Sequence, residues 1–267
     1  MPAVQLARLR RQTAELAEYF FQSEILVRRL KDLLEFYADR TQRPNQPGAA
    51  NTLIRSYKVP QPVMRRIVLE LGEQVDSDPQ AALNLIDALW AQETLETKLL
   101  AIELLGRLSP EMHSAVSQRA QEWNQDNDES LLLEALADKG MSRLREEAPD
   151  TLLKLLNGLL KSENIRQQRL GLHALQLLLE EGKYENLPAV YKNLGPVLKK
   201  ADKALRSSLI AVLRPLAKQS PQETAYFLRQ TLSKNQSRTL TQIIRRTLED
   251  FPPETQKSLR STLKGEE

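Results

Sequence analysis

The chain of 267 residues contains no cysteine, only two histidines and only nine glycines. The absence of cysteine excludes disulfides, cysteine-ligated zinc and a cysteine nucleophile. The two histidines, His113 and His173, are too few for a multi-histidine metal site. Nine glycines are about half of the usual share of about 7 %, so a glycine-rich Rossmann sheet or a turn-dense β-sandwich is not expected. A phosphate-binding loop and a nucleophile elbow are also missing, and we therefore expect neither a metal nor a cofactor.

Long apolar runs are absent as well. No stretch approaches the roughly 18 apolar residues of a membrane-spanning helix. The N-terminus has no apolar signal-peptide core. We therefore expect a cytoplasmic protein without a membrane partner.

Charge is distributed unevenly along the chain. Residues 1–133 have a net charge of −4 and residues 134–267 a net charge of +7, which together give the total of +3. The excess is largest in residues 183–246, which hold 13 basic and three acidic residues. A concentrated positive field attracts polyanions such as DNA, although the same composition also fits a solvated basic surface. If this stretch binds DNA, the side chains expected to contact phosphates are Lys203, Arg206, Arg214, Lys218, Arg245 and Arg246.

Apolar residues recur at helical spacing almost everywhere, and no convincing strand pattern is present. Prolines also recur at the start of amphipathic stretches, where a missing N–H does no harm. They stand at positions 79, 110, 149, 188, 221 and 253, separated by 31, 39, 39, 33 and 32 residues. Each interval accommodates two helices and two short loops. The sequence therefore predicts an all-α, HEAT-like α-solenoid.

The predicted solenoid has about six antiparallel helix pairs with extra N-terminal helices. The expected pairs are 60–75 with 79–91, 93–108 with 110–123, 129–146 with 149–161, 164–181 with 187–200, 203–218 with 221–232, and 236–249 with 254–264. Two further helices are expected at 4–21 and 24–38, before a loop at 41–50. Because each pair buries its apolar side against its neighbours, residues 51–267 are expected to form one cooperative domain, on which residues 1–50 pack.

Three scarce side chains each admit a functional and a structural interpretation. Trp90 and Trp123 are either stacking platforms for nucleic-acid bases or core aromatics between repeats, and we favour the core. His173, in the apolar segment GLHAL, is likewise interpreted as a packed core residue.

Five segments, taken in order, carry a resemblance to a known family. They are SYKVPQPVMRRIVLEL from Ser56, LWAQETLETKLLAIELL from Leu89, SENIRQQRLGLHAL from Ser162, LRPLAKQSPQETAYFLRQ from Leu213 and TLTQIIRRTLE from Thr239. Each is weak alone, but their order and spacing over about residues 25–250 resemble the AlkD family of HEAT-like-repeat DNA glycosylases. The resemblance implies double-stranded or damaged DNA as the partner and hydrolysis of the glycosidic bond of a cationic alkylated purine.

The family's site is described as two tryptophans, an aspartate and an arginine around the lesion. By resemblance, the arginine falls on Arg169 and the carboxylate near Glu134, which makes these two the catalytic candidates. One tryptophan position falls on Ser130, or on Asp128 with a gap, and the other near Ala211. The stacking rings are therefore lost.

A further aromatic position of the family is occupied by Arg166, which joins Arg169 among the expected DNA-binding residues. Each lost indole removes stacking and cation–π contacts of about 0.5–2 kcal/mol. The sequence thus predicts an AlkD-like protein that binds DNA through a basic concave surface and has weak or absent glycosylase activity.

Two alternatives stay open at this point. The chain is either an active alkylpurine glycosylase that uses Glu134 and Arg169 with other aromatics, or a protein–protein scaffold whose groove holds an acidic helix or tail. A salt-dependent DNA affinity separates the scaffold from the other two functions. Release of alkylated bases separates the active glycosylase from the DNA-binding protein.

Overall fold

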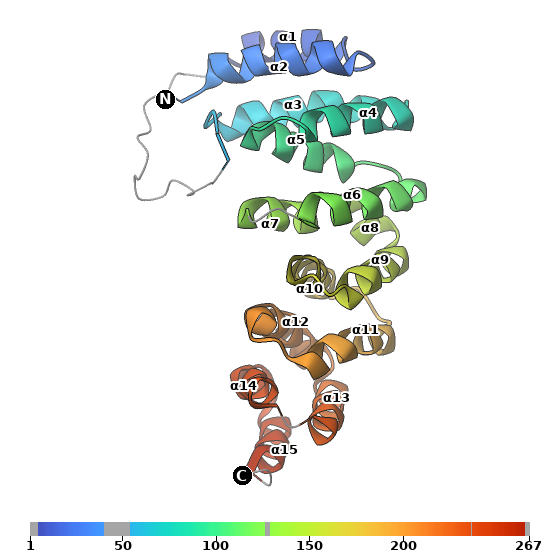
Figure 1. Ribbon diagram of the computed structural model, residues 1–267, viewed down its shortest axis with the longest axis vertical. Helices are drawn as coiled ribbons and strands as arrows, with labels where there is room; N and C mark the ends of the chain where they lie inside the picture. Colours follow the sequence, from blue (N-terminus) through green and yellow to red (C-terminus); the bar gives the residue numbers. More distant parts are fainter. Residues whose placement is uncertain (1–4, 40–53, 126–128, 236, 265–267) are drawn as a thin grey trace. The chain divides into compact units, whose positions relative to one another are not determined.

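Helices make up most of the computed structural model, which describes residues 5–39, 54–125, 129–235 and 237–264 (Figure 1). Over these residues there is no strand, and the β-type pairing is limited to an isolated bridge between Arg55 and Thr94. The prediction of an all-α protein is confirmed. Within the same ranges, no helix is long and apolar enough to cross a membrane.

The chain divides into two compact units, Met1–Ala120 with Asn127–Glu147, and Gln121–Asp126 with Ala148–Glu267. The expectation of one cooperative domain over residues 51–267 stays a prediction. The helices up to Glu147 are α1 (Leu6–Ala17), α2 (Ser23–Tyr37), α3 (Gln61–Val75), α4 (Pro79–Trp90), α5 (Leu95–Leu105), the short η1 (Pro110–Met112), α6 (His113–Gln125), α7 (Ser130–Asp138) and α8 (Ser142–Glu147). All belong to the first unit except the last five residues of α6, which belong to the second.

Alternate helices of the first unit pack side by side. Helix α1 contacts α3, α3 contacts α5, and α5 contacts α7, while α2 contacts α4. The two N-terminal helices therefore follow the same alternation as the helices after them. This stacking of every second helix is what a solenoid-like fold requires.

The second unit repeats the pattern in two rows. Its helices are α9 (Pro149–Lys161), α10 (Ile165–Glu180), α11 (Leu187–Lys200), the short η2 (Lys203–Leu205), α12 (Arg206–Gln219), α13 (Pro221–Lys234), α14 (Arg238–Thr247), the short η3 (Leu248–Asp250) and α15 (Pro253–Lys264). Helices α10, α12 and α14 contact one another in order and form one row, while α9, α11, α13 and α15 form the other (Figure 1).

Hydrogen bonds between neighbouring helices of the second unit show the length of the repeat. Arg206 Nη1 donates to Gln242 Oε1 at 3.0 Å, and Asn235 Nδ2 donates to the carbonyl oxygen of Lys199. Both bonds join residues 36 positions apart. This separation lies within the range of the proline intervals, as expected if each proline marks one repeat.

The prolines stand where the sequence places them. Pro79, Pro149 and Pro221 are the first residues of α4, α9 and α13. Ahead of Pro79, Asp78 Oδ1 accepts from the backbone N–H groups of Gln80 and Ala81 at 3.1 and 2.9 Å. Such a cap satisfies donors that the first helical turn leaves unpaired.

One predicted helix is divided. The periodicity predicts a helix over 129–146, but α7 ends at Asp138 and α8 begins at Ser142. At the break, the Lys139 carbonyl lies against Gly106 so closely that a Cβ on Gly106 would be 1.8 Å from its oxygen. Ser142 Oγ donates to the carbonyl oxygen of Lys139 at 2.9 Å and, more weakly, to that of Gly106 at 3.4 Å. The missing side chain of Gly106 therefore permits the close approach of the chain between α7 and α8.

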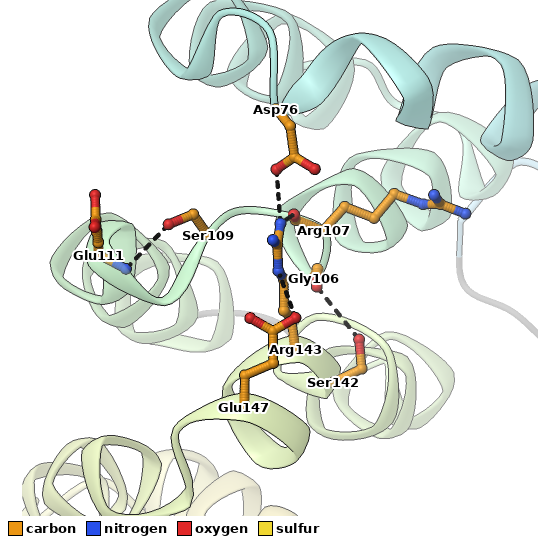
Figure 2. A network of polar contacts seen from close by, with 8 residues as sticks. All are labelled: Asp76, Gly106, Arg107, Ser109, Glu111, Ser142, Arg143 and Glu147. Atoms are coloured by element: carbon orange, nitrogen blue, oxygen red, sulfur yellow. Dashed lines mark hydrogen bonds and ion pairs between the residues drawn. The ribbon is translucent and has the colours of Figure 1, made fainter.

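Arg143 then fastens α8 to the ends of α3 and α5 (Figure 2). Its Nη1 donates to Asp76 Oδ1 and to the carbonyl oxygen of Arg107, both at 2.7 Å, and its Nε donates to Glu147 Oε1 at 3.0 Å. The hydrogen bond to Asp76 raises the pKa of the Arg143 guanidinium further, so the group stays charged. At the break itself, Arg145 Nη1 donates to the last carbonyl oxygens of α7, those of Ala137 and Asp138, at 3.2 and 3.1 Å.

Replacing Gly106 with alanine tests this contact. We expect Gly106→Ala to lower the free energy of unfolding by about 1–3 kcal/mol, because the new methyl group forces the backbone of α7 or α5 to move. The measurement is urea unfolding followed by circular dichroism.

Gly158→Ala is the matched control, since Gly158 is exposed on α9 and the nearest atom to its added Cβ would be 3.9 Å away. In an exposed helix interior this change should stabilise the protein by about 0.5–1 kcal/mol. Equal stability of the two variants would contradict the proposed close approach.

Candidate nucleic-acid interface

Helix α12, the middle helix of the α10–α12–α14 row, has one apolar and one basic face. Leu209, Val212, Leu213 and Leu216 are buried. Arg214 and Lys218, four residues apart, are exposed on the opposite face. The helix contains three basic residues and no acidic one.

Helix α14 likewise has one apolar and one basic face. Leu240, Ile243 and Ile244 are buried, and Arg245 and Arg246 are exposed. Arg238, seven residues before Arg245, is exposed on the same face. Arg238 was not among the residues predicted to contact DNA, although its spacing from Arg245 is a signal that the sequence contains. Helix α14, like α12, has no acidic residue.

Helix α10 contributes two arginines and a histidine. Arg169 is exposed, and Arg166 is partly buried and donates from Nη1 to the carbonyl oxygen of Gln125 at 3.2 Å. His173, one helical turn after Arg169, is partly buried as well. The interpretation of His173 as a packed core residue is therefore wrong. The apolar residues beside it in GLHAL face the core, whereas the ring lies on the same side of the helix as Arg169.

Polar contacts connect the basic side chains to the neighbouring helix. Arg206 reaches Gln242 on α14, and Arg214 Nε lies 3.4 Å from Asp250 Oδ2, just beyond α14. Lys203 is exposed in η2, which Asp202 caps by accepting from the Ala204 N–H at 2.7 Å. These contacts align side chains across α12 and α14 without burying their charge.

Several of the basic side chains are available for an external anion. Within the described part of the chain, Arg169, Lys203, Lys218 and Arg246 form no ion pair with an acidic side chain. Basic residues are not confined to this row, since α11 also has three lysines and no acidic residue. One of these, Lys200, is paired with Glu163 at 2.8 Å.

The two catalytic candidates are both exposed. Glu134 lies on α7 in the first unit, and Arg169 lies on α10 in the second. Their pairing in one site stays a prediction. Ser130 is the first residue of α7, one turn before Glu134, and Ala211 lies on α12 one turn before Arg214. Asp128 lies outside the described residues.

The two tryptophans are engaged within the protein. Trp123 is buried, with 7 % of its surface exposed. Trp90 is partly buried, and Lys98 Nζ lies 4.3 Å from the centre of its ring while donating to the Trp90 carbonyl oxygen at 2.7 Å. Burial lowers the pKa of the Lys98 ammonium. The core interpretation is confirmed for Trp123, and one ring face of Trp90 is covered.

A comparison with known families decides where the chain belongs. The family described as DNA alkylation repair enzyme matches residues 30–250. The chain belongs to this family. The match to the DNA alkylation repair family begins in α2 and ends with η3, so it includes every candidate residue discussed above. No curated protein and no solved structure is significantly similar to the chain.

Among the described residues there is no group of three or more histidine, aspartate or glutamate side chains that could hold a metal ion.

The exposure of Glu134 and Arg169 leads to a prediction about stability. If they serve function and not folding, Glu134→Gln and Arg169→Ala should each change the free energy of unfolding by no more than about 0.5 kcal/mol. Thermal and urea unfolding of the purified variants measure this. A loss in both single variants that is no larger in the double variant than in either one would instead show a structural ion pair between them.

Proposed function

We propose that the protein binds double-stranded DNA, including damaged DNA, through the exposed basic face of the α10–α12–α14 row, and that its glycosylase activity is weak or absent. One observation carries the proposal. Three neighbouring helices each expose arginine or lysine, and two of them, α12 and α14, contain no acidic residue.

The dimensions of the row suit a DNA backbone. Packed helix axes are about 8–10 Å apart, so three helices extend over roughly 20 Å. That length corresponds to about six base pairs at about 3.4 Å for each phosphate of a strand. Arg169, Lys218 and Arg246 each lie on a different helix of the row. At that helix spacing they would contact about every third phosphate of a strand without reading bases.

The state of the aromatic residues supports weak or absent base excision. A cationic alkylated base is held well by an open indole face. In this chain Trp123 is buried and Trp90 is already covered by Lys98 on one face. By the family resemblance, the usual positions of the indoles hold Ser130 and Ala211. What remains is a basic surface with an exposed carboxylate, Glu134, and no free indole to hold the base.

DNA binding is tested by salt titration of matched triple variants. For the wild type, we expect the logarithm of the affinity for a duplex to fall linearly with the logarithm of the salt concentration. Arg169→Ala/Lys218→Ala/Arg246→Ala should weaken binding and reduce the steepness of that line by about 2–3, since each lost phosphate contact removes about 0.9. Fluorescence anisotropy of a labelled duplex gives both quantities.

The control triple variant is Lys154→Ala/Lys192→Ala/Lys234→Ala, which removes one exposed lysine from each of α9, α11 and α13. It lowers the net charge by as much as the first triple variant does, but leaves the α10–α12–α14 row intact. We expect a much smaller change in slope. Equal effects of the two variants would mean that binding follows net charge alone, and no binding at low salt would refute the proposal.

Base excision is tested directly on methylated duplex DNA. We expect little or no release of alkylated purines from the DNA, because the loss of two stacking rings removes about 1–4 kcal/mol, which at about 1.4 kcal/mol per tenfold lowers the rate roughly fivefold to several hundredfold. Chromatography of the freed bases measures the release. Efficient excision that disappears in Glu134→Gln would instead identify an active glycosylase.

A further inference from the structure

A groove of about 530 Å³ lies between α11 and α13, in the row of the second unit that does not carry the proposed DNA surface. Its apolar lining consists of Pro188, Tyr191, Tyr226 and Phe227. The ring centres of Tyr191 and Phe227 are 5.0 Å apart with planes inclined at 35°. Together these residues form a surface made almost entirely of rings.

The two tyrosines of the groove are held differently. The Tyr191 hydroxyl is hydrogen-bonded to Thr224 Oγ1 at 2.9 Å, which fixes the ring. Burial raises the pKa of this hydroxyl, so the group stays neutral. Tyr226 is 62 % exposed, so its ring is open to contact by a ligand.

Polar side chains are placed at regular intervals along the groove. Gln222, Tyr226 and Gln230 follow one another at four-residue intervals and lie on one side of α13. Eight helical residues extend over about 12 Å. Two amide groups, which can donate to peptide carbonyls, therefore flank the exposed ring.

The charge of the groove is opposite to that of its surroundings. Of the described residues that line it, Glu223 alone is charged. One of its oxygens accepts from Ser220 Oγ at 2.7 Å, and the carboxylate is exposed. Residues 183–246 contain 13 basic residues and only two other acidic ones. A ligand that enters the groove thus meets a negative group in a positive region.

We propose that this groove binds an extended, proline-containing peptide with an arginine next to the prolines. A polyproline II chain has no internal hydrogen bonds, leaves its carbonyls free and docks on aromatic-lined grooves. At about 3.1 Å per residue, four of its residues match the 12 Å between Gln222 and Gln230. The prolines pack on Tyr191, Tyr226 and Phe227, the two glutamines donate to carbonyls, and the arginine pairs with Glu223.

Two other occupants fit the groove less well. An amphipathic helix needs a continuous run of aliphatic contacts, whereas glutamines stand on both sides of the ring here. A second copy of this chain would have to present a basic segment with rings or prolines on its own surface. The experiment below distinguishes a second copy of the chain from the peptide.

The test uses the full chain and three fluorescent ten-residue peptides. The first is polyproline with one flanking arginine, the second has glutamate in place of that arginine, and the third has glycine in place of the prolines. We expect the first peptide to bind at least about tenfold more tightly than either of the others, because aromatic contact and the charged pair act together. Fluorescence anisotropy gives the dissociation constants, and sedimentation at the same concentrations gives the oligomeric state.

Two variants locate the binding. Tyr226→Ala should lower the affinity for the first peptide about tenfold or more. Glu223→Gln should remove most of the preference for the arginine peptide over the glutamate peptide. Phe21→Ala is the control, since Phe21 is also 62 % exposed but lies outside the groove. Both groove variants should bind duplex DNA like the wild type, which separates this proposal from the proposed function.

Three outcomes would overturn the proposal. They are no binding of the first peptide at millimolar concentration, equal binding of the glycine peptide, and an affinity that Tyr226→Ala leaves unchanged. Self-association that Tyr226→Ala abolishes, without peptide binding, would assign the groove to a second copy of the chain.

Discussion

The fold depends on one constraint, which is that each helix must bury its apolar side both against an adjacent helix in the chain and against the helices two positions before and after it. In the second unit, α12 is packed between α10 and α14 and also contacts α13. Only one side of α12 is then left for solvent, and it carries Arg214 and Lys218. A functional residue of such a row has to lie in this narrow stripe, because every other direction is occupied by neighbours.

Much of the architecture follows from the sequence because the signals are local. Proline intervals and apolar periodicity predict the helices closely, and the first residues of α4, α9 and α13 are the predicted prolines. The break between α7 and α8 could not be predicted in this way. It depends on contact between Lys139 and Gly106, which are distant in sequence, whereas the leucines of 129–146 alone favour an unbroken helix.

Most residues of the candidate site could be named from the sequence, but their arrangement on one surface could not. The basic character of residues 183–246 is visible in the sequence, but its assignment to the exposed faces of α12 and α14 required the structure. His173 was misjudged because its neighbours are apolar, although a one-residue step around a helix turns a side chain by about 100°. The groove between α11 and α13 was not predicted, because Tyr191 and Tyr226, which both line it, come from helices of two different repeats.

Bonded positions on neighbouring helices of the second unit lie about one repeat apart, 36 residues in the two bonds described above and 33 to 40 in others, and this spacing bears on how the chain folds. The bonds from Arg206 to Gln242 and from Asn235 to Lys199 close loops of one repeat, not of a whole domain. Contacts of such short separation are formed early, and chains dominated by them fold rapidly. Each repeat of the second unit can therefore assemble on its predecessor, and opening that starts at α15 can spread inward one helix pair at a time. The helices that follow α12 in the chain would open first, so the basic face of α10 and α12 is protected from fraying at the C-terminal end.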